Sequence, residues 1–356
     1  MAMQSYALTP GRIEKFKGKI LKTAEPLEIL AKFGKQVPMP KNNSRNYVAR
    51  RWLPYGGTST NQNTINRFFT DGTGDRGNVI VQANQVAEGI TPVPDSVTPV
   101  DTTVVMQQYA ALYGLTDVTY NLYEDDVAGA MFDQSSKRMV FVNELIIYGA
   151  LKACTNAFFG GTGTTRATVN GAITLPSCRA VIRNLKANHA EPIATVLKAG
   201  PNFGTSPVSR SYTAICHTNL EGDLRDLPNF IPVERYATGT AMPGEIGSCE
   251  GLRFVLHPDL PEFQDAGATV ASTGGQFFST TGTNIDVYPV IVLGQDAFSQ
   301  VSVKGSDNLK PTFIMPGTQS ASDPFGQRGY VGQMWWKAVL LENQGWMAVL
   351  NVARRV

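Results

Sequence analysis

Apolar residues recur at steps of three or four from Asn121 to about Phe159, a spacing typical of one face of an α-helix. The residues on this face are Val127, Met131, Ser135, Met139, Val142, Ile146, Ala150, Cys154 and Phe158. Asn121 and Glu124 have the spacing of a capping box at its start, and the sequence FGGTGTT is expected to end it. At about 1.5 Å per residue this helix extends over about 54 Å, far longer than the usual helix of a globular protein.

Strand-like segments surround a long polar stretch in the first third of the chain. Residues 45–53, RNYVARRWL, predict a strand, and strand-like runs resume between residues 78 and 115. The stretch between them is rich in Gly, Asn and Thr. Two long strands flanking such a tip predict an extended hairpin that projects from the body. Because structureless loops of this length are uncommon inside compact domains, we expect a neighbouring molecule to order the tip.

Residues 176 to about 310 have the mixed pattern of an α/β domain. The segment PSCRAVIRNLKANHA predicts a helix, RSYTAICHTNLEGDLRDL a strand leading into a helix, and GLRFVLHPDL and NIDVYPVIVLGQDAF two further strands. The last segment, Asp323–Val356, carries large apolar side chains that cost about 1.5–3 kcal/mol each when left in water. Chain ends are usually frayed, so this composition predicts an unusually buried tail. Adjacent strand residues face opposite sides, so Trp335 and Trp336 are expected to point in opposite directions.

The first 40 or so residues are expected to form an arm that packs on something else. Residues 11–33 have a weakly amphipathic helical pattern that is interrupted at Pro26. Eleven basic and three acidic residues give Met1–Trp52 a charge of +8, which leaves −6 for the rest of a chain of net charge +2. A basic arm on a mildly acidic body suits either a polyanion or the body of a neighbouring copy. A solvated helix face is the alternative that the sequence leaves open.

The composition favours a β-rich protein with extensive protein contacts. A chain of 356 residues with 42% hydrophobic residues has ample core for two or three domains, or for one with long extensions. Only 17% of the residues are charged, against roughly 25% in a typical protein. The four cysteines have no metal-ligand spacing and are typical of buried thiols in a reducing compartment. No apolar stretch has the length of a signal peptide or a membrane span, so we expect folding in a cytosol.

No residues in the sequence have the pattern of a catalytic, cofactor or metal site. The sequence GTGDRG at 72–77 matches GxGxxG, but a strand-like run follows where a dinucleotide site needs a helix, so a hairpin tip is the better interpretation. Helix capping explains the pair Asp125–Asp126 better than a bound cation does. The histidines are far apart in the sequence and have no ligand-spaced partners; they are His189, His217 and His257. The sequence therefore predicts no enzyme activity, no cofactor and no metal.

The order of these elements resembles the major capsid protein of tailed bacteriophages, which has the Johnson fold (Hong Kong 97 type), and in particular a podophage-associated coat family. The stretches that carry the resemblance are EPLEILAKFGKQVPMPKNNSRNYVARRW, AEGITPVPDSVTPVDTTVVMQQYAALYGLTDV, GEIGSCEGLRFV and DPFGQRGYVGQMWWKAVLLENQGWMAVLNVA. Together with the order of the elements, the resemblance covers nearly the whole chain.

The resemblance implies an α+β fold with four parts. They are an N-terminal arm at 1–44, an extended β-hairpin loop at 45–100, a peripheral domain at 101–170 and 309–356 with a spine helix at about 122–159, and an axial domain at 171–308. In that arrangement the C-terminal segment is expected to be the last β layer that closes the peripheral domain against the spine helix.

The resemblance also implies a function: self-assembly into an icosahedral phage head that encloses double-stranded DNA. The implied location is the virion, after assembly in the host bacterial cytoplasm. The implied partners are many copies of the chain in hexamers and pentamers, a portal protein, a separate scaffolding protein, a decoration protein where one is present, and genomic DNA bound without sequence specificity. No membrane and no covalent crosslink between subunits are expected.

The residues expected to contact other copies lie in the loop and in the arm. In the loop they are Arg50, Arg51, Trp52, Arg67, Phe68, Phe69 and Arg76, and in the arm Ile13, Phe16, Leu30 and Phe33. The residues expected to face DNA or acidic neighbours are Lys15, Lys17, Lys19 and Lys22. Two alternatives remain: a soluble α/β enzyme or ligand-binding protein with a pocket in 171–308, and another phage structural protein such as a tail tube.

Overall fold

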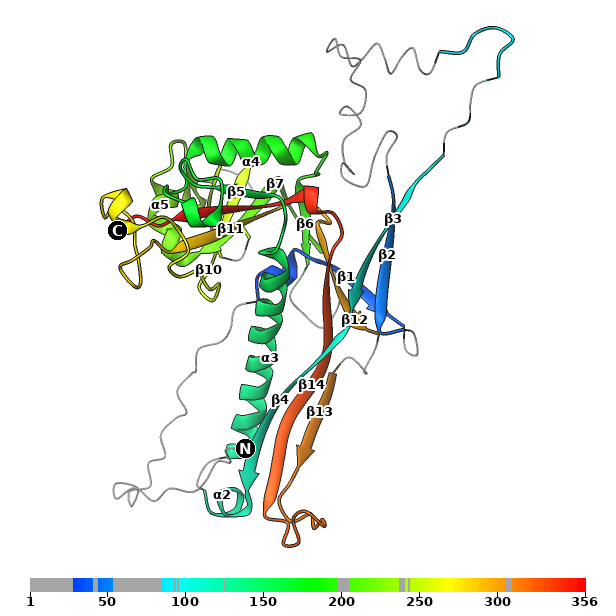
Figure 1. Ribbon diagram of the computed structural model, residues 1–356. Helices are drawn as coiled ribbons and strands as arrows, with labels where there is room; N and C mark the ends of the chain where they lie inside the picture. Colours follow the sequence, from blue (N-terminus) through cyan, green and yellow to red (C-terminus); the bar gives the residue numbers. More distant parts are fainter. Residues whose placement is uncertain are drawn as a thin grey trace. The chain divides into compact units, whose positions relative to one another are not determined.

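The computed structural model describes residues 28–40, 44–53, 85–91, 94, 96–123, 126–197, 205–236, 241–242, 244–304 and 309–356. The chain forms two compact units, each assembled from three separate stretches of sequence (Figure 1). The first unit draws on Met1–Tyr47, Val105–Gly149 and Gln300–Val339. The second draws on Val48–Val104, Ala150–Ser299 and Leu340–Val356.

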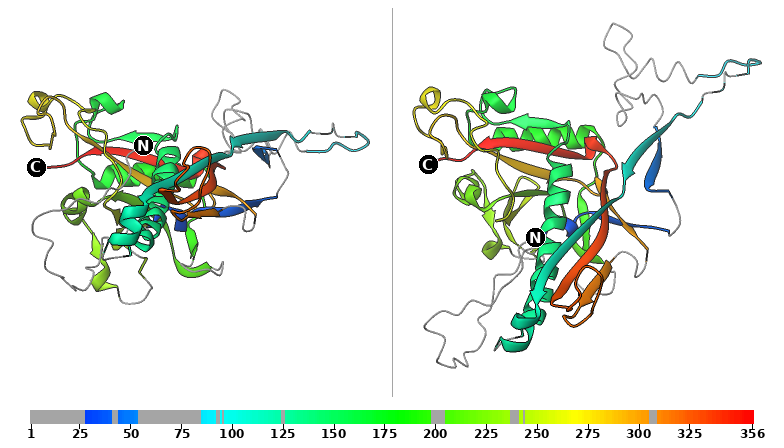
Figure 2. Two further views of the ribbon diagram at one scale, coloured as in Figure 1. Left: turned by 90° about the horizontal axis from the view of Figure 1, so that it is seen from below. Right: turned by 60° about the horizontal axis from the view of Figure 1, so that its bottom comes forward.

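The first unit consists of a long helix on a β-sheet. Helix α3 (Val127–Leu151) lies along strands β4 (Gln107–Thr116) and β14 (Arg328–Leu341), as Figures 1 and 2 both show. Strand β14 pairs antiparallel with β4 and, at its other edge, with β13 (Leu309–Ile314). The sheet continues through β12 (Phe298–Val303) to β1 (Lys35–Met39). The short helix α2 (Asp117–Leu122) follows β4, and a 3-10 helix, η1 (Leu30–Lys32), precedes β1.

Alternation along β14 explains why α3 packs on one face of the sheet. Gln333 and Trp335 point to the same side and are buried there. The indole Nε1–H of Trp335 donates a hydrogen bond to Asn143 Oδ1 at 2.9 Å, and Gln333 Nε2 donates one to Ser136 Oγ at 2.6 Å. Trp336, on the other side of the strand, is partly exposed. The predicted opposite orientation of the two tryptophans is confirmed.

A two-stranded ribbon is formed by β2 (Asn46–Trp52) and β3 (Pro99–Val105). Two backbone hydrogen bonds frame it, Leu53 N–H to Thr98 O and Met106 N–H to Arg45 O, both 3.0 Å long. These bonds show that the strands run in opposite directions. The strand predicted at 45–53 is confirmed, whereas residues 54–84, with the GTGDRG motif, lie outside the described residues.

The second unit is built on an eight-stranded sheet with the order β5-β15-β11-β7-β10-β9-β8, in which β6 pairs with β7. The inner strands are β7 (Thr205–His217), β10 (Leu252–His257), β11 (Val287–Leu293) and β15 (Met347–Ala353). The others are β5 (Ala157–Phe159), β6 (Ile193–Leu197), β8 (Ile231–Pro232) and β9 (Glu245–Cys249). Strands β7 and β10 are parallel, and β11 is antiparallel to both β7 and β15.

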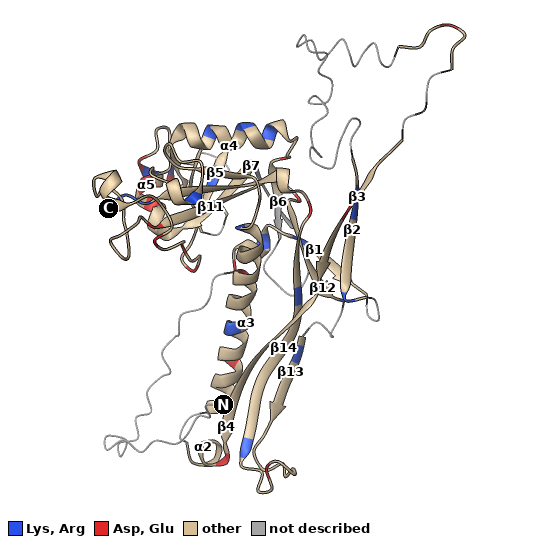
Figure 3. Ribbon diagram, viewed as in Figure 1, with Lys and Arg blue, Asp and Glu red and all other residues tan. Residues whose placement is uncertain are grey.

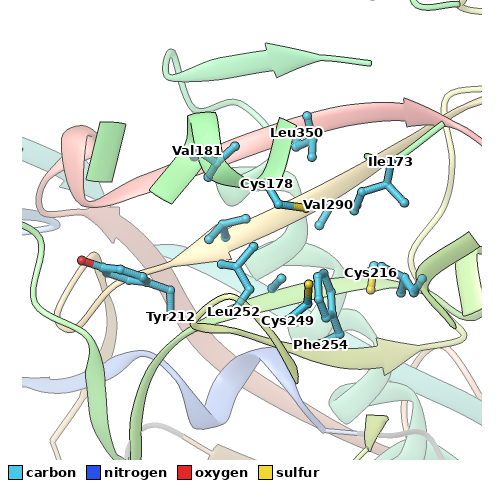
Figure 4. Packing of buried hydrophobic residues seen from close by; sticks show 14 of the residues in the cluster. Ile173, Cys178, Val181, Tyr212, Cys216, Cys249, Leu252, Phe254, Val290 and Leu350 are labelled. Carbon is cyan, nitrogen blue, oxygen red and sulfur yellow. The ribbon is translucent and has the colours of Figure 1, made fainter. Parts of the chain in front are cut away.

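Helix α4 (Leu175–Ala187) covers one face of this sheet and closes its core. Thr174 and Ser177 form a capping box at its start. Its buried residues Cys178 and Val181 belong to the same hydrophobic cluster as Val290 of β11 and Leu350 of β15 (Figure 4). Among the described residues, the remaining helices are α5 (Glu221–Arg225) and the 3-10 helices Arg166–Thr168, Thr218–Leu220, Val233–Arg235, Val270–Thr273 and Gln344–Trp346. The helix and strands predicted between residues 176 and 293 are confirmed.

The helix predicted over residues 121–159 is wrong at both ends. Its first two residues, Asn121 and Leu122, are the end of α2, which begins earlier at a cap formed by Thr116, and α3 ends at Leu151. Asp126 caps α3, because its Oδ1 accepts the Gly129 N–H at 2.9 Å. Cys154 follows the helix, and Phe158 lies in β5, opposite Leu350 of β15. Pairing with a buried strand therefore overrides the helical spacing of Phe158.

The expected position of the C-terminal tail is also wrong. We expected all of residues 309–356 to join the long helix, but only the part up to Val339 belongs to its unit. Strand β15 pairs with β11 over seven residues, from Val287 opposite Ala353 to Leu293 opposite Met347. All seven residues of β15 are buried, so this pairing places the last part of the tail, Met347–Ala353, in the second unit's sheet. The predicted burial is confirmed for Trp335, Leu340, Val349 and Leu350, whereas Trp336 and Trp346 are partly exposed.

Candidate functional site

Five of the residues predicted to contact other copies are described by the structure. Arg50, Arg51 and Trp52 lie on β2, and Leu30 and Phe33 lie at the start of the first unit. The others fall outside the described residues; they are Ile13, Phe16, Arg67, Phe68, Phe69 and Arg76, together with Lys15, Lys17, Lys19 and Lys22.

The exposed face of the ribbon combines an ion pair with uncovered apolar side chains. Arg50 Nε and Nη2 donate to the two carboxylate oxygens of Asp101, on the neighbouring strand, at 2.7 and 2.8 Å. This hydrogen-bonded pair lowers the pKa of Asp101. Val48 and Trp52 share the face of Arg50 by alternation and are 51% and 59% exposed. An isolated two-stranded ribbon is only marginally stable, so such a face suits contact with a larger surface.

Arg51 lies on the opposite face of the ribbon. It is half-buried, and burial lowers the pKa of its guanidinium, while Glu342 raises it. Residues of its own chain, including Glu342, therefore account for at least part of the surroundings of Arg51. The period-2 pattern of β2 already separates Arg51 from Arg50 and Trp52, so the three residues do not form one surface.

The described end of the arm is fixed to α3 by a carboxylate that the sequence analysis missed. Glu144 is 2% exposed, and it accepts the backbone N–H groups of Ile29, Leu30 and Ala31 at 3.3, 2.9 and 3.1 Å. Leu30 is fully buried within its own unit, whereas Phe33 is partly buried. The signal in the sequence is that Glu144 is the single acidic residue between Gln134 and Leu151.

A partly buried lysine lies beside this carboxylate. Lys337 Nζ donates to Gln300 Oε1 at 2.5 Å, and Gln300 Nε2 donates to Ala31 O at 2.7 Å. Burial lowers the pKa of Lys337 to about 8, although Glu28 and Glu144 favour its charged form. Keeping Lys337 protonated at neutral pH therefore costs more free energy in the folded protein than in the unfolded chain.

We expect the stability of the first unit to rise with pH because of Lys337. Between about pH 8 and the ordinary lysine value of 10.5, the unfolded chain retains a proton that the folded chain has lost. The free energy of unfolding should therefore increase across this window, by up to about 3 kcal/mol. Urea unfolding of the wild type and of Lys337→Met from pH 7 to 10.5 measures it. The increase in the free energy of unfolding with pH should be smaller in Lys337→Met than in the wild type. The control Lys310→Met, which alters an exposed lysine of β13, should keep the wild-type increase. An equal increase in all three proteins would contradict the prediction.

A second exposed apolar surface lies at one end of the first unit. Leu122 of α2 is 66% exposed, and Phe325 in the turn before β14 is 80% exposed. The Asp117 N–H donates to Gln327 O at 3.0 Å, so helix α2 and this turn are neighbours. Strand β4 carries no charged residue (Figure 3). All residues of β13 are exposed. Exposed apolar clusters of this kind mark contact surfaces more often than chemistry.

The titratable groups of the second unit have structural roles. The parallel register of β7 and β10 places His217 opposite His257, a proximity that sequence spacing does not reveal. The Nδ1 atoms of the two rings accept backbone N–H groups, from Asn219 at 2.9 Å and from Asp259 at 3.1 Å. Burial lowers the pKa of His217 and raises that of the Cys178 thiol to about 12. Both shifts favour the neutral forms.

Within the described ranges, no group of three or more His, Cys, Asp or Glu side chains could hold a metal ion. The helices of the described part are too short or too polar to cross a bilayer.

Comparison with known proteins connects this fold to phage capsids. No protein family model matches the chain. Over 138 residues, 36% of its length, the chain is 28% identical to a protein named the major capsid protein of Pseudomonas phage KPP21. The matched part spans 34% of that protein. The sequence likeness is therefore local.

The structural likeness extends from end to end. The capsid of Ralstonia phage GP4 matches with a TM-score of 0.62 at 10% identity, covering 99% of each chain. The capsid of cyanophage Pam1 matches with 0.58 at 12%, covering 99% of this chain and 100% of that one. The capsid of cyanophage P-SCSP1u matches with a TM-score of 0.56 at 12% identity, covering 96% of this chain and 93% of that one. The chain therefore has the mixed helix and sheet fold of these capsid proteins. This agrees with the mixed content of helix and strand in the predicted α+β class.

Proposed function

We propose that the protein is the major capsid protein of a tailed bacteriophage, with the Johnson fold of the Hong Kong 97 type. The observation that carries the proposal is the end-to-end fold match to capsid proteins, which covers 96–99% of the chain. The local sequence match to a capsid protein of a Pseudomonas phage agrees with it. Many copies close an icosahedral shell around double-stranded DNA, and the protein acts through contacts between copies and not as an enzyme.

The proposed contacts between copies are of two kinds. The face of the ribbon with Arg50 and Trp52 lies over a neighbouring copy, and residues 1–44, the N-terminal arm, pass from the body to another. Interfaces of several thousand Å², largely apolar, are typical of obligate assemblies. The low charge content and the exposed apolar residues of the first unit fit such burial.

Further parts of the proposal concern domains and partners. Residues 45–100 form the extended loop, 101–149 and 300–339 the peripheral domain, and the second unit's sheet, with β5 and β15, the axial domain. The partners are further copies in hexamers and pentamers, a portal protein, a separate scaffolding protein, a decoration protein where one is present, and DNA. The basic residues of the arm bind the DNA through its phosphates, so this binding is insensitive to sequence and weakens with salt. Assembly takes place in the host bacterial cytoplasm.

We expect Trp52→Ala to prevent shell formation without unfolding the protein. Trp52 is 59% exposed in the single chain, so its removal costs the fold little, whereas a shell contact loses a large apolar side chain. Native mass spectrometry and negative-stain microscopy of the purified protein, with a scaffold where needed, measure assembly. The wild type and Trp52→Phe should form shells or hexamer and pentamer rings.

Other outcomes discriminate between functions. A wild type that stays monomeric at high concentration even with a scaffold would contradict the capsid proposal. Stacked rings would indicate a tail tube, and a discrete small oligomer with turnover would indicate an enzyme. Shells from Trp52→Ala equal to those of the wild type would contradict the role given to the ribbon face alone.

A further inference from the structure

The contact between Glu144 and the chain at residues 29–31 joins three consecutive amides to one side chain. Glu144 Oε2 accepts the N–H groups of Ile29 and Leu30, and Oε1 accepts that of Ala31. These amides stand at the start of η1, where a helix leaves its first N–H groups without backbone acceptors. The carboxylate lies more than 110 residues away in the sequence and is almost fully buried. It therefore acts as a helix cap supplied by another element.

The other side of the same segment is held by side chains as well. Gln300 of β12, which has no exposed surface, donates from Nε2 to the Ala31 carbonyl and accepts from Lys337 of β14. Strand pairing begins only at β1, at Lys35. Residues 29–31 are thus held by polar side chains of α3 and β12, together with the burial of Ile29 and Leu30, and not by a strand ladder. Groups held in this way can open locally while the sheet stays intact.

We propose that Glu144 is the positioning residue that fixes where the N-terminal arm leaves the body of the protein. Residues 29–31 begin the described part of the proposed arm, and one side chain, Glu144, supplies most of the side-chain hydrogen bonds that hold them. The consequence for assembly rests on the proposed function, because a shell needs every arm to depart from an equivalent point. The anchor itself does not depend on that function.

The chemistry of the contact requires a carboxylate. Ionised Glu has two acceptor oxygens, which together satisfy three N–H donors. In Glu144→Gln one carboxylate oxygen is replaced by an NH2 group, which is a donor and cannot accept. At least one backbone N–H of residues 29–31 then loses its acceptor. The volume of the side chain is unchanged, so packing around Leu30 is preserved. Hydrogen bonds to charged groups are also stronger than those to neutral ones.

Hydrogen exchange of Glu144→Gln tests the anchor. The amides of residues 29–31 should exchange roughly ten- to a hundredfold faster than in the wild type, as expected for the loss of a charge-assisted hydrogen bond. Amides of β14 and β15 should keep their protection. The matched control is Asp133→Asn, which makes the same charge change on α3 at an exposed position paired with Lys137. It should leave residues 29–31 unchanged.

Two results of this experiment would overturn the inference. Unchanged exchange at residues 29–31 would show that Glu144 does not hold the segment. An equal increase along β14 would show that Glu144 only stabilises the unit as a whole.

Particle images of the same variants test the consequence for assembly. Glu144→Gln should give fewer closed shells and more irregular ones than Asp133→Asn. Normal shells from a variant whose anchor exchanges rapidly would overturn the positioning role in assembly. If the wild type and Asp133→Asn also form no shells, the proposed function fails, and the exchange result still decides the anchor.

Discussion

Removal of residues 344–356 is expected to unfold the second unit. The deletion takes out β15, which lies between β5 and β11 and pairs with both. It leaves the backbone groups of β11 without partners inside a buried sheet. It also removes four large buried side chains, Met347, Val349, Leu350 and Val352, each worth about 1.5–3 kcal/mol. Their sum of roughly 6–12 kcal/mol matches the whole stability of a typical domain, about 5–15 kcal/mol.

Circular dichroism in the near ultraviolet and hydrogen exchange of β7 and β11 measure this loss. A shorter deletion, of residues 354–356, is the control. It removes backbone hydrogen bonds at the chain end but no residue of the hydrophobic core, so the second unit should still fold. A soluble protein lacking 344–356 with native protection in β7 and β11 would show that the tail serves an interface and not the fold.

The parts of the fold that could be predicted from the sequence are those whose local pattern and tertiary surroundings agree. The helix α4 and the apolar strands β10 and β11 have a clear period or a continuous apolar run and are buried accordingly, and the strand of residues 45–53 has a period of two that its exposure follows. The burial of the tail also follows from composition, because large apolar side chains are costly in water wherever the chain places them.

The parts that could not be predicted depend on partners distant in the sequence. The apolar spacing of the long helix continues through Cys154 and Phe158, but β15 offers Phe158 a strand partner, and that pairing decides its conformation. Nothing local indicates that the tail joins β11 and not the long helix, since both sites are apolar. Strand pairing of this kind is set by the whole sheet.

The candidate site shows the same limit. The exposed ribbon face with Arg50 and Trp52 follows from alternation once β2 is recognised, and alternation also separates Arg51 from them. The anchor could not be predicted in this way. Glu144 stands out only as an acid in an apolar stretch, and its three partners are identified by packing alone.

We expect the buried ion pair of Arg253 and Glu245 to produce the largest effect of any single substitution considered. Arg253 Nε lies 2.8 Å from Glu245 Oε1, and the side chains are 5% and 0% exposed. Glu245 also accepts the Tyr236 hydroxyl at 2.8 Å and the Met242 N–H at 2.7 Å, so it joins β9 and β10 to the preceding segment. In Arg253→Met the carboxylate remains buried without its counter-charge. This should lower the free energy of unfolding by about 3–5 kcal/mol.

A double-mutant cycle separates the cost of the unpaired charge from the worth of the pair. Arg253→Met combined with Glu245→Leu removes both charges, so the double variant should be more stable than Arg253→Met alone. The same cycle on Arg179 and Glu250, an exposed pair joined by two hydrogen bonds, should show far smaller changes, because water and salt screen its charges. Urea unfolding of each variant gives the energies. The loss in free energy of unfolding of the double variant could instead equal the sum of the losses of the two single variants. That result would mean that the two side chains stabilise the sheet independently, through packing and not through their charges.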